Sequence, residues 1–184
     1  IGNLYYNNGC YNSVSAAGAP YAHNWIANAK STWNGCVMDR DQSNDVNASA
    51  VNYRARQYIT CPTAMMPLST DWAALNAKID AMAPSGATNV TIGMQMAWQT
   101  LSPVAPFNAP APAPDLDKVI ILLTDGENTQ NRWTSSTSAI DARTQQVCAY
   151  AKAANIKIYT VRVIDGNSGL LQSCPSKPEM YFNV

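Results

Sequence analysis

The sequence predicts an α/β fold in which helices flank a mostly parallel sheet, and two stretches of the chain carry this prediction. Residues 118–124 contain the continuous apolar run Val119–Leu123, which is typical of a strand buried on both faces in a parallel sheet. Residues 156–163 are rich in β-branched and aromatic side chains and predict a second strand. Between them, residues 138–154 repeat apolar and small side chains at helical spacing. A strand, a helix and a strand of these lengths form a βαβ unit, with an expected right-handed crossover.

Two further helices are expected before the first of these strands. Ser69 or Thr70 can cap a helix that runs to about residue 82. Its apolar positions form one stripe: Trp72, Leu75, Ile79 and Met82. A second helix is expected after Thr88 and ends before the proline-rich loop 103–115. The helical spacing of Trp72 and Trp98 favours core positions for both side chains.

The N-terminal third of the chain predicts little regular structure. Residues 1–35 have weak periodicity and predict mostly loop, with a short helix at 24–30. The whole chain of 184 residues fits one domain, 1–184. Within it, residues 1–68 are expected to be an irregular, disulfide-tied insertion, and residues 69–184 to be the regular α/β part.

Composition excludes two classes of partner. The chain has 12 basic and 12 acidic residues and no basic patch, which argues against nucleic-acid binding. No stretch approaches the ~20 apolar residues of a membrane span.

The chain begins at Ile1 rather than Met, so it is expected to be processed or a fragment, which leaves room for a membrane anchor upstream.

The five cysteines favour disulfides over a metal site. No two of them form a Cys-x-x-Cys pair, and His23 is the only histidine, so the four clustered ligands of a structural zinc site are not apparent. Widely spaced cysteines are typical of disulfides in an oxidising compartment. Five cysteines allow fifteen arrangements of two pairs and one free thiol.

Two residues are candidate ligands for a metal ion. Asp125 directly follows the predicted strand 118–124, and ligands of open parallel sheets bind at the carboxyl ends of the strands. The simpler interpretation is a turn formed by Asp125 and Gly126. Thr88 precedes a predicted helix, where it can cap the helix or offer its hydroxyl to a hard cation.

These residues lie in motifs that resemble the von Willebrand factor A family. The motifs are Gly86-Ala87-Thr88-Asn89 with Gly93, and Lys118–Asn128 with its Thr124-Asp125-Gly126 turn. More narrowly, the chain resembles the TadG-like proteins of the Tad/Flp pilus-assembly group. Supporting stretches that extend the resemblance over about residues 33–184 are Trp33–Val37, Cys61-Pro62, Pro67–Ser69, Ala97–Pro103, Leu170–Cys174 and Tyr181-Phe182.

The resemblance implies a three-layer fold and a metal-ion-dependent adhesion site. In this family, one loop supplies Asp-x-Ser-x-Ser, a second supplies threonine and a third supplies aspartate. Thr88 and Asp125 match the second and third loops. They would bind a divalent cation (Mg²⁺ or Ca²⁺), and a carboxylate of a partner protein would complete its coordination. The same resemblance implies the disulfides Cys36–Cys61 and Cys148–Cys174, with Cys10 left over.

The sequence departs from the family at both ends. No strand followed by Asp-x-Ser-x-Ser is present, although this first strand is central in the family's sheet, and the closing helix after residue 184 is also missing. Strands that lack this neighbour are expected to expose backbone groups and apolar side chains. We therefore expect the natural polypeptide to be longer, or another segment to fill the gap.

An oxygen-rich run resembles the start of a calcium loop. It consists of Asp39, Asp41, Ser43 and Asp45. An EF-hand requires glycine and a closing glutamate at the positions of Asn44 and Ala50, so a solvated polar loop is the better interpretation. Asp41-Gln42-Ser43 also mimics part of the missing loop, but no apolar strand precedes it.

Three functions remain open from the sequence. The preferred one is a non-enzymatic, extracytoplasmic module for protein interaction or adhesion in a bacterial pilus or surface-assembly system. Its partner would be a pilus or envelope component or a surface receptor. The alternatives are a structural envelope component without a working metal site and a metal-assisted hydrolase, for which Glu127 is the nearby candidate base.

Overall fold

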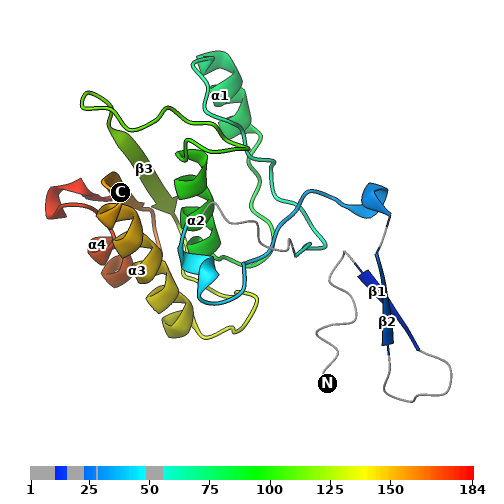
Figure 1. The fold of residues 1–184 in the computed structure, drawn as a ribbon. Coiled ribbons are helices and arrows are strands. Elements are labelled where there is room, and N and C mark those ends of the chain that lie inside the picture. The colour runs from blue at the N-terminus through cyan, green and yellow to red at the C-terminus, as the bar shows by residue number, and fades with distance from the viewer. Residues whose placement is uncertain (1–10, 16–22, 28, 49–55) are drawn as a thin grey trace.

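The computed structural model describes residues 11–15, 23–27, 29–48 and 56–184 (Figure 1). Its central element is a parallel three-stranded sheet with the order β3-β4-β5. The strands are β3 (Lys118–Thr124), β4 (Ile156–Arg162) and β5 (Tyr181–Asn183). The predicted α/β class and the parallel pairing of the first two strands are confirmed, whereas β5 was not predicted.

Helices cover one face of this sheet (Figure 1). They are α2 (Val90–Thr100), α3 (Thr137–Ala153) and the short α4 (Ser168–Ser173). Ile120 and Ile158 are paired in register and are 5% and 0% exposed, so they mark the covered face. The core side chains packed over it come from α2, α3 and the residues around them: Val46, Val90, Met94, Val147, Cys148, Ala151 and Cys174. Trp98 packs against this core, as predicted.

The opposite face of β3 is exposed. Val119, Ile121 and Leu123 are 40%, 68% and 63% exposed, so the prediction that this strand is buried on both faces is wrong for the described residues. The reason is that α2, α3 and α4, which contact the sheet, pack on the other side. Because β3 is also the edge of the sheet, the exposed backbone and apolar side chains agree with the expectation for a strand that lacks a neighbour.

The N-terminal residues form a separate hairpin. The strands β1 (Tyr11–Ser15) and β2 (His23–Ala27) pair antiparallel and are followed by the 3-10 helix η2 (Lys30–Thr32). The helix predicted at 24–30 is therefore wrong, since residues 23–27 are extended. Cys10 lies outside the described residues. After η2, the described part of the expected irregular segment contains the 3-10 helix η3 (Asn44–Val46), which contacts α2 and α3.

The helix α1 (Trp72–Asp80) is found where a helix was predicted, but its surroundings differ. Asp71, rather than Ser69 or Thr70, caps it, because the Asp71 carboxylate accepts a hydrogen bond of 3.0 Å from the Ala74 N–H. Trp72 is 74% exposed, so its predicted core position is wrong. Among the described helices, neither α1 nor any other is long and apolar enough to cross a bilayer.

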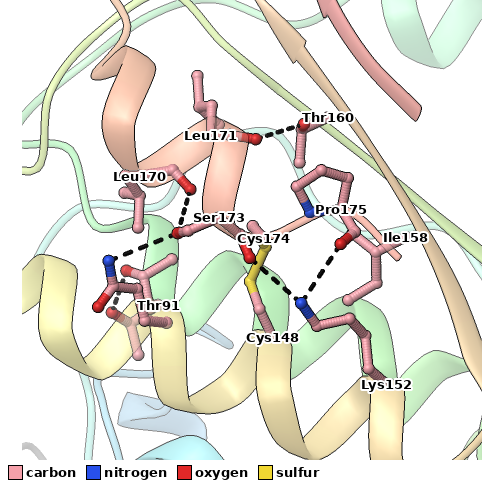
Figure 2. The surroundings of a disulfide bond; sticks show 12 residues. Thr91, Cys148, Lys152, Ile158, Thr160, Leu170, Leu171, Ser173, Cys174 and Pro175 are labelled. Atoms are coloured by element: carbon pink, nitrogen blue, oxygen red, sulfur yellow. Dashed lines mark hydrogen bonds between the residues drawn. A yellow bond between two sulfur atoms is a disulfide. The ribbon is translucent and has the colours of Figure 1, made fainter. Parts of the chain in front are cut away.

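Two disulfides stabilise the fold, and they are the pairs that the family resemblance implies. Cys148 on α3 is bonded to Cys174, which follows α4, with 5.4 Å between their Cα atoms (Figure 2). Both residues are buried, and Lys152 donates hydrogen bonds to the carbonyls of Ser173 and Pro175 beside them. This disulfide fixes α4 against α3. Cys36 is bonded to Cys61 with a Cα–Cα distance of 5.2 Å and closes the irregular segment.

Candidate functional site

The structure brings the two predicted metal ligands to neighbouring loops at the carboxyl end of β3. Asp125 directly follows the strand, and Thr88 lies in the loop before α2. A Cβ atom placed on Gly126 would lie 3.8 Å from Thr88 Oγ1, so the threonine hydroxyl faces the backbone next to Asp125. Sequence positions 37 residues apart therefore meet at the edge where parallel sheets bind ligands.

Hydrogen bonds clamp these two loops together. The Thr88 N–H donates to Thr129 Oγ1 over 2.8 Å, and the Thr129 N–H donates to the Thr88 carbonyl over 3.0 Å. Asn128, which is 1% exposed, accepts from the Val90 N–H over 2.7 Å and donates to Asp141 over 2.7 Å. The two loops are thus held in a fixed relation by contacts that do not use the candidate ligand atoms.

The Thr88 hydroxyl is not the cap of α2. Asn89 fills that role, since its side-chain oxygen accepts a hydrogen bond of 3.3 Å from the Ile92 N–H. The interpretation of Thr88 as the cap is therefore wrong. Within the described ranges, no hydrogen bond involves Thr88 Oγ1, and this oxygen remains available to a ligand.

The Asp125 carboxylate also lacks a bonding partner among the described residues. The turn after β3 is closed by Thr124, whose hydroxyl accepts from the Gly126 N–H over 3.3 Å and donates to the Gly126 carbonyl over 3.2 Å. Asp125 is exposed, and its carboxylate makes no hydrogen bond or ion pair to any residue that the structure describes. Asp125 therefore belongs to a turn, as the simpler interpretation held, but the turn does not use its side chain.

The donor atoms present fit a hard divalent cation in part. A hydroxyl and a carboxylate are oxygen ligands of the kind that Mg²⁺ and Ca²⁺ prefer, but these ions take six or more ligands. In the part of the chain that the structure describes, no three His, Cys, Asp or Glu residues lie close enough to hold a metal. Thr88 and Asp125 thus supply two donors, and their assignment as metal ligands stays a prediction.

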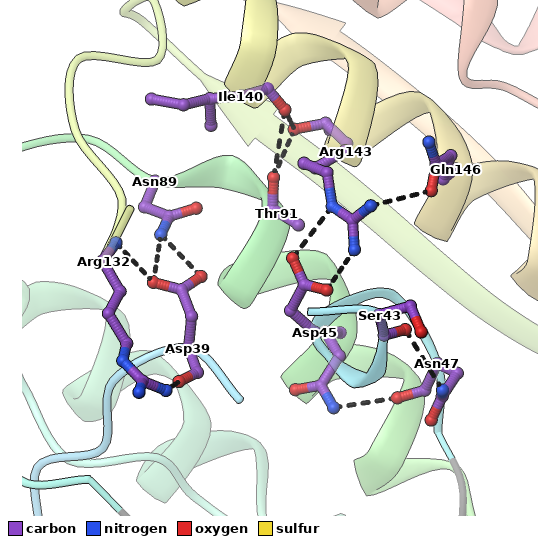
Figure 3. A network of polar contacts seen from close by, with 12 residues as sticks. Asp39, Ser43, Asp45, Asn47, Asn89, Thr91, Arg132, Ile140, Arg143 and Gln146 are labelled. Atoms are coloured by element: carbon purple, nitrogen blue, oxygen red, sulfur yellow. Dashed lines mark hydrogen bonds and ion pairs between the residues drawn. The ribbon is translucent and has the colours of Figure 1, made fainter. Parts of the chain in front are cut away.

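The oxygen-rich run 39–45 uses two of its carboxylates in contacts within the fold. Asp39 is 5% exposed, and both its carboxylate oxygens accept from the Asn89 amide, at 2.9 and 3.0 Å (Figure 3). Asp45 is 3% exposed and is bonded to the Arg143 guanidinium. The interpretation as a solvated loop is therefore wrong for Asp39 and Asp45, whose carboxylates tie the irregular segment to α2 and α3, whereas Asp41 and Ser43 are exposed.

Asp41 pairs with an arginine of the loop after β3. It is exposed and forms an ion pair of 2.8 Å with Arg132, whose guanidinium stacks on Trp133 with 4.1 Å to the ring centre. Arg132 also donates its backbone N–H to Asp39 over 3.1 Å. The resemblance of Asp41-Gln42-Ser43 to the missing first loop therefore has another explanation, which is attachment of this segment to the loop after β3.

Sequence reasoning missed Asn128 and Arg132, which position these loops. Both are polar residues in the loop after β3, where exposed polar side chains are common, so residue type alone gives no signal of burial. Their partners Val90, Asp141 and Asp39 are distant in the sequence. Only the folded arrangement identifies them.

Comparison with known proteins gives one family match. The model of the von Willebrand factor type A domain matches residues 26–184. A search of curated protein sequences finds no significant match.

Two similar solved structures are of proximal thread matrix protein 1 from the mussel byssus. The first is 16% identical with a TM-score of 0.46, and the match covers 61% of this chain and 26% of the mussel chain. The second, described as having a zinc-occupied MIDAS motif, is 17% identical with a TM-score of 0.47. Its match covers 64% of this chain and 28% of the mussel chain. This chain thus spans little more than a quarter of their length.

Proposed function

Because this chain belongs to the von Willebrand factor type A family, we propose that it is a protein-interaction module that binds its partner through a divalent cation. Domains of this family typically act in protein interaction and adhesion. The observation that carries the proposal is the pair Thr88 and Asp125. Their side-chain oxygens lie on two clamped loops, and neither has a partner among the described residues.

Each residue of the site has a distinct part in this proposal. Asp125 supplies negative charge to the cation, and Thr88 supplies a neutral oxygen. Asn128 and Thr129 hold the two loops so that these donors keep their positions when a partner is absent. When bound, the cation would offer a coordination position to a carboxylate of the partner protein.

We further propose an extracytoplasmic setting and a non-enzymatic role. Two disulfides support an oxidising compartment, such as a bacterial periplasm or cell surface. The TadG-like motifs support a place in pilus assembly, with a pilus or envelope component or a surface receptor as the partner. Glu127, the candidate base of a hydrolase, is exposed beside Asp125 and would need a reacting group held next to it.

The cation site is tested by titrating the 184-residue chain with Mn²⁺ and measuring bound metal by electron paramagnetic resonance. We expect saturable binding by the unmodified chain, which Asp125→Ala weakens at least about tenfold, since a charged ligand is lost. Thr88→Ala is expected to weaken it less, because a neutral oxygen is lost. Asp115→Ala removes an exposed carboxylate from the loop before β3 and should leave the titration unchanged.

Three results would decide against the proposal. Absence of saturable Mn²⁺ binding would favour a structural envelope component without a metal site. Equal binding by the Asp125→Ala and Asp115→Ala variants would show that Asp125 is not a ligand of the bound metal. Hydrolysis of a phosphate or carboxylate ester that is abolished by Glu127→Gln would favour the hydrolase.

A further inference from the structure

A cavity of about 240 Å³ lies beside the candidate metal loops. One wall comes from the disulfide-tied segment and includes Met38, Tyr58 and Pro62. The opposite wall comes from the loop before α2 and from its first turns, where Ala87 and Ile92 line it. The cavity is therefore formed between the irregular segment and the regular α/β part.

Backbone contacts and a disulfide hold the wall of the irregular segment. The Met38 N–H donates to the Arg56 carbonyl over 2.8 Å, and the Tyr58 N–H donates to the Cys36 carbonyl over 3.1 Å. These bonds make a short extended pair, which the Cys36–Cys61 bond closes. Cys61 itself lines the cavity. The Cys36–Cys61 bond thus holds this wall together covalently.

The charged groups at the cavity already have partners. Asp39 lines it, but its carboxylate accepts from the Asn89 amide and the Arg132 N–H. The Arg132 guanidinium donates to the Asp39 carbonyl over 3.3 Å and to Asp41 over 2.8 Å. The single negative and single positive charge of the lining therefore balance, and neither is set up to attract an ion. What remains to contact a ligand is largely carbon, from Met38, Tyr58, Pro62, Ala87 and Ile92.

The cavity is continuous with the loops that present the candidate metal ligands. Gly86, Ala87 and Asn89 line it and flank Thr88 in the sequence. Gln130 also lines it and donates its N–H to the Thr88 carbonyl over 3.4 Å. A polypeptide that reaches Thr88 therefore has the cavity next to it.

We propose that this cavity is a specificity pocket that receives an uncharged, apolar side chain of the partner protein. The proposal rests on the proposed function, because the same partner would place a carboxylate near Thr88 and Asp125. A metal-bound carboxylate gives little discrimination between partners, since many proteins expose one. The pocket adds discrimination through the size and charge of a second side chain.

The test uses four blocked amino acids as probes: the N-acetyl amides of leucine, phenylalanine, lysine and aspartate. Each is titrated into the ¹⁵N-labelled 184-residue chain, and backbone amide shifts are followed by NMR. We expect the leucine and phenylalanine probes to give saturable shifts at Tyr58, Ala87 and Asn131, and the lysine and aspartate probes to give none there. Equal shifts with the charged probes, or no saturable shift with any probe, would overturn the proposal.

Matched variants locate the binding. Tyr58→Ala removes part of the wall and is expected to weaken the binding of the phenylalanine probe about tenfold. Ile59→Ala, at the adjacent residue, which is 87% exposed and does not line the cavity, should leave the affinity unchanged. Ala87→Phe, at an exposed position, is a second variant that fills the cavity and should abolish the shifts. Equal effects of Tyr58→Ala and Ile59→Ala, or undiminished binding by Ala87→Phe, would contradict the assignment.

All titrations are run in excess EDTA, so that the outcome does not depend on a metal ion. Failure of Mn²⁺ binding would then remove the proposed cation site and leave the pocket result readable. Failure of the probes in a chain that binds Mn²⁺ would remove the pocket alone.

Discussion

Replacing Ile158 by alanine is expected to lower the free energy of unfolding by about 3 kcal/mol. Ile158 lies in the middle of β4 and is 0% exposed, between the helices α2 and α3 and the sheet. The smaller side chain leaves a cavity that the surrounding core cannot fill without moving the disulfide-linked Cys148 and Cys174. The measurement is urea unfolding at equilibrium, followed by far-ultraviolet circular dichroism.

Ile121→Ala is the matched control for this prediction. Ile121 lies on the neighbouring strand β3, but its side chain is on the other face and is 68% exposed. We expect a loss below about 0.5 kcal/mol, because little of this side chain is removed from water in the folded chain. A loss at Ile121 as large as that at Ile158 would show that the second face is covered in solution.

Replacing Arg143 by methionine is expected to lower the free energy of unfolding by about 3 kcal/mol. The Arg143 guanidinium is bonded to the Asp45 carboxylate, and the Asp45 side chain is only 2% exposed. Without its partner, the Asp45 carboxylate is left as an unpaired charge in a buried position. The double variant Asp45→Asn with Arg143→Met should recover part of the loss, since no unpaired charge remains.

A surface ion pair provides the control for Arg143. Lys157 and Asp117 are paired, but their side chains are 46% and 67% exposed. Lys157→Met is therefore expected to change the free energy of unfolding by less than about 0.5 kcal/mol, because water screens this pair. If urea unfolding gave equal losses for Arg143→Met and Lys157→Met, the Asp45 carboxylate would have to be hydrated in solution.

The sequence predicted best the elements whose pattern is local and continuous. The apolar run of β3 gave the observed bounds of that strand, and α3 was placed within one residue at each end. Asn155 lies between α3 and β4 and has a positive φ of 61°, as a helix-ending asparagine often does. These features depend on residues that are adjacent in the sequence.

Burial was predicted less well, because it depends on residues far away in the chain. Asp45 is buried through Arg143, which lies 98 residues away, and nothing near Asp45 indicates this partner. Trp72 has the helical spacing of a core residue, but no described element packs over it. The cap of α2 could not be predicted from residue type either, since both asparagine and threonine can cap a helix. In the structure Asn89 is the cap, and the Thr88 N–H is bonded to Thr129.

The two disulfides also determine how the chain would carry a mechanical load. Their cysteines are 25 and 26 residues apart, so a pull on the two ends of the oxidised chain bypasses both covalent loops. At about 3.5 Å per extended residue, the stretched length is reduced by about 170 Å. All of β4 lies within the second loop, between Cys148 and Cys174. Tension can therefore detach β4 from its neighbours, but it cannot stretch this strand until the disulfide is reduced.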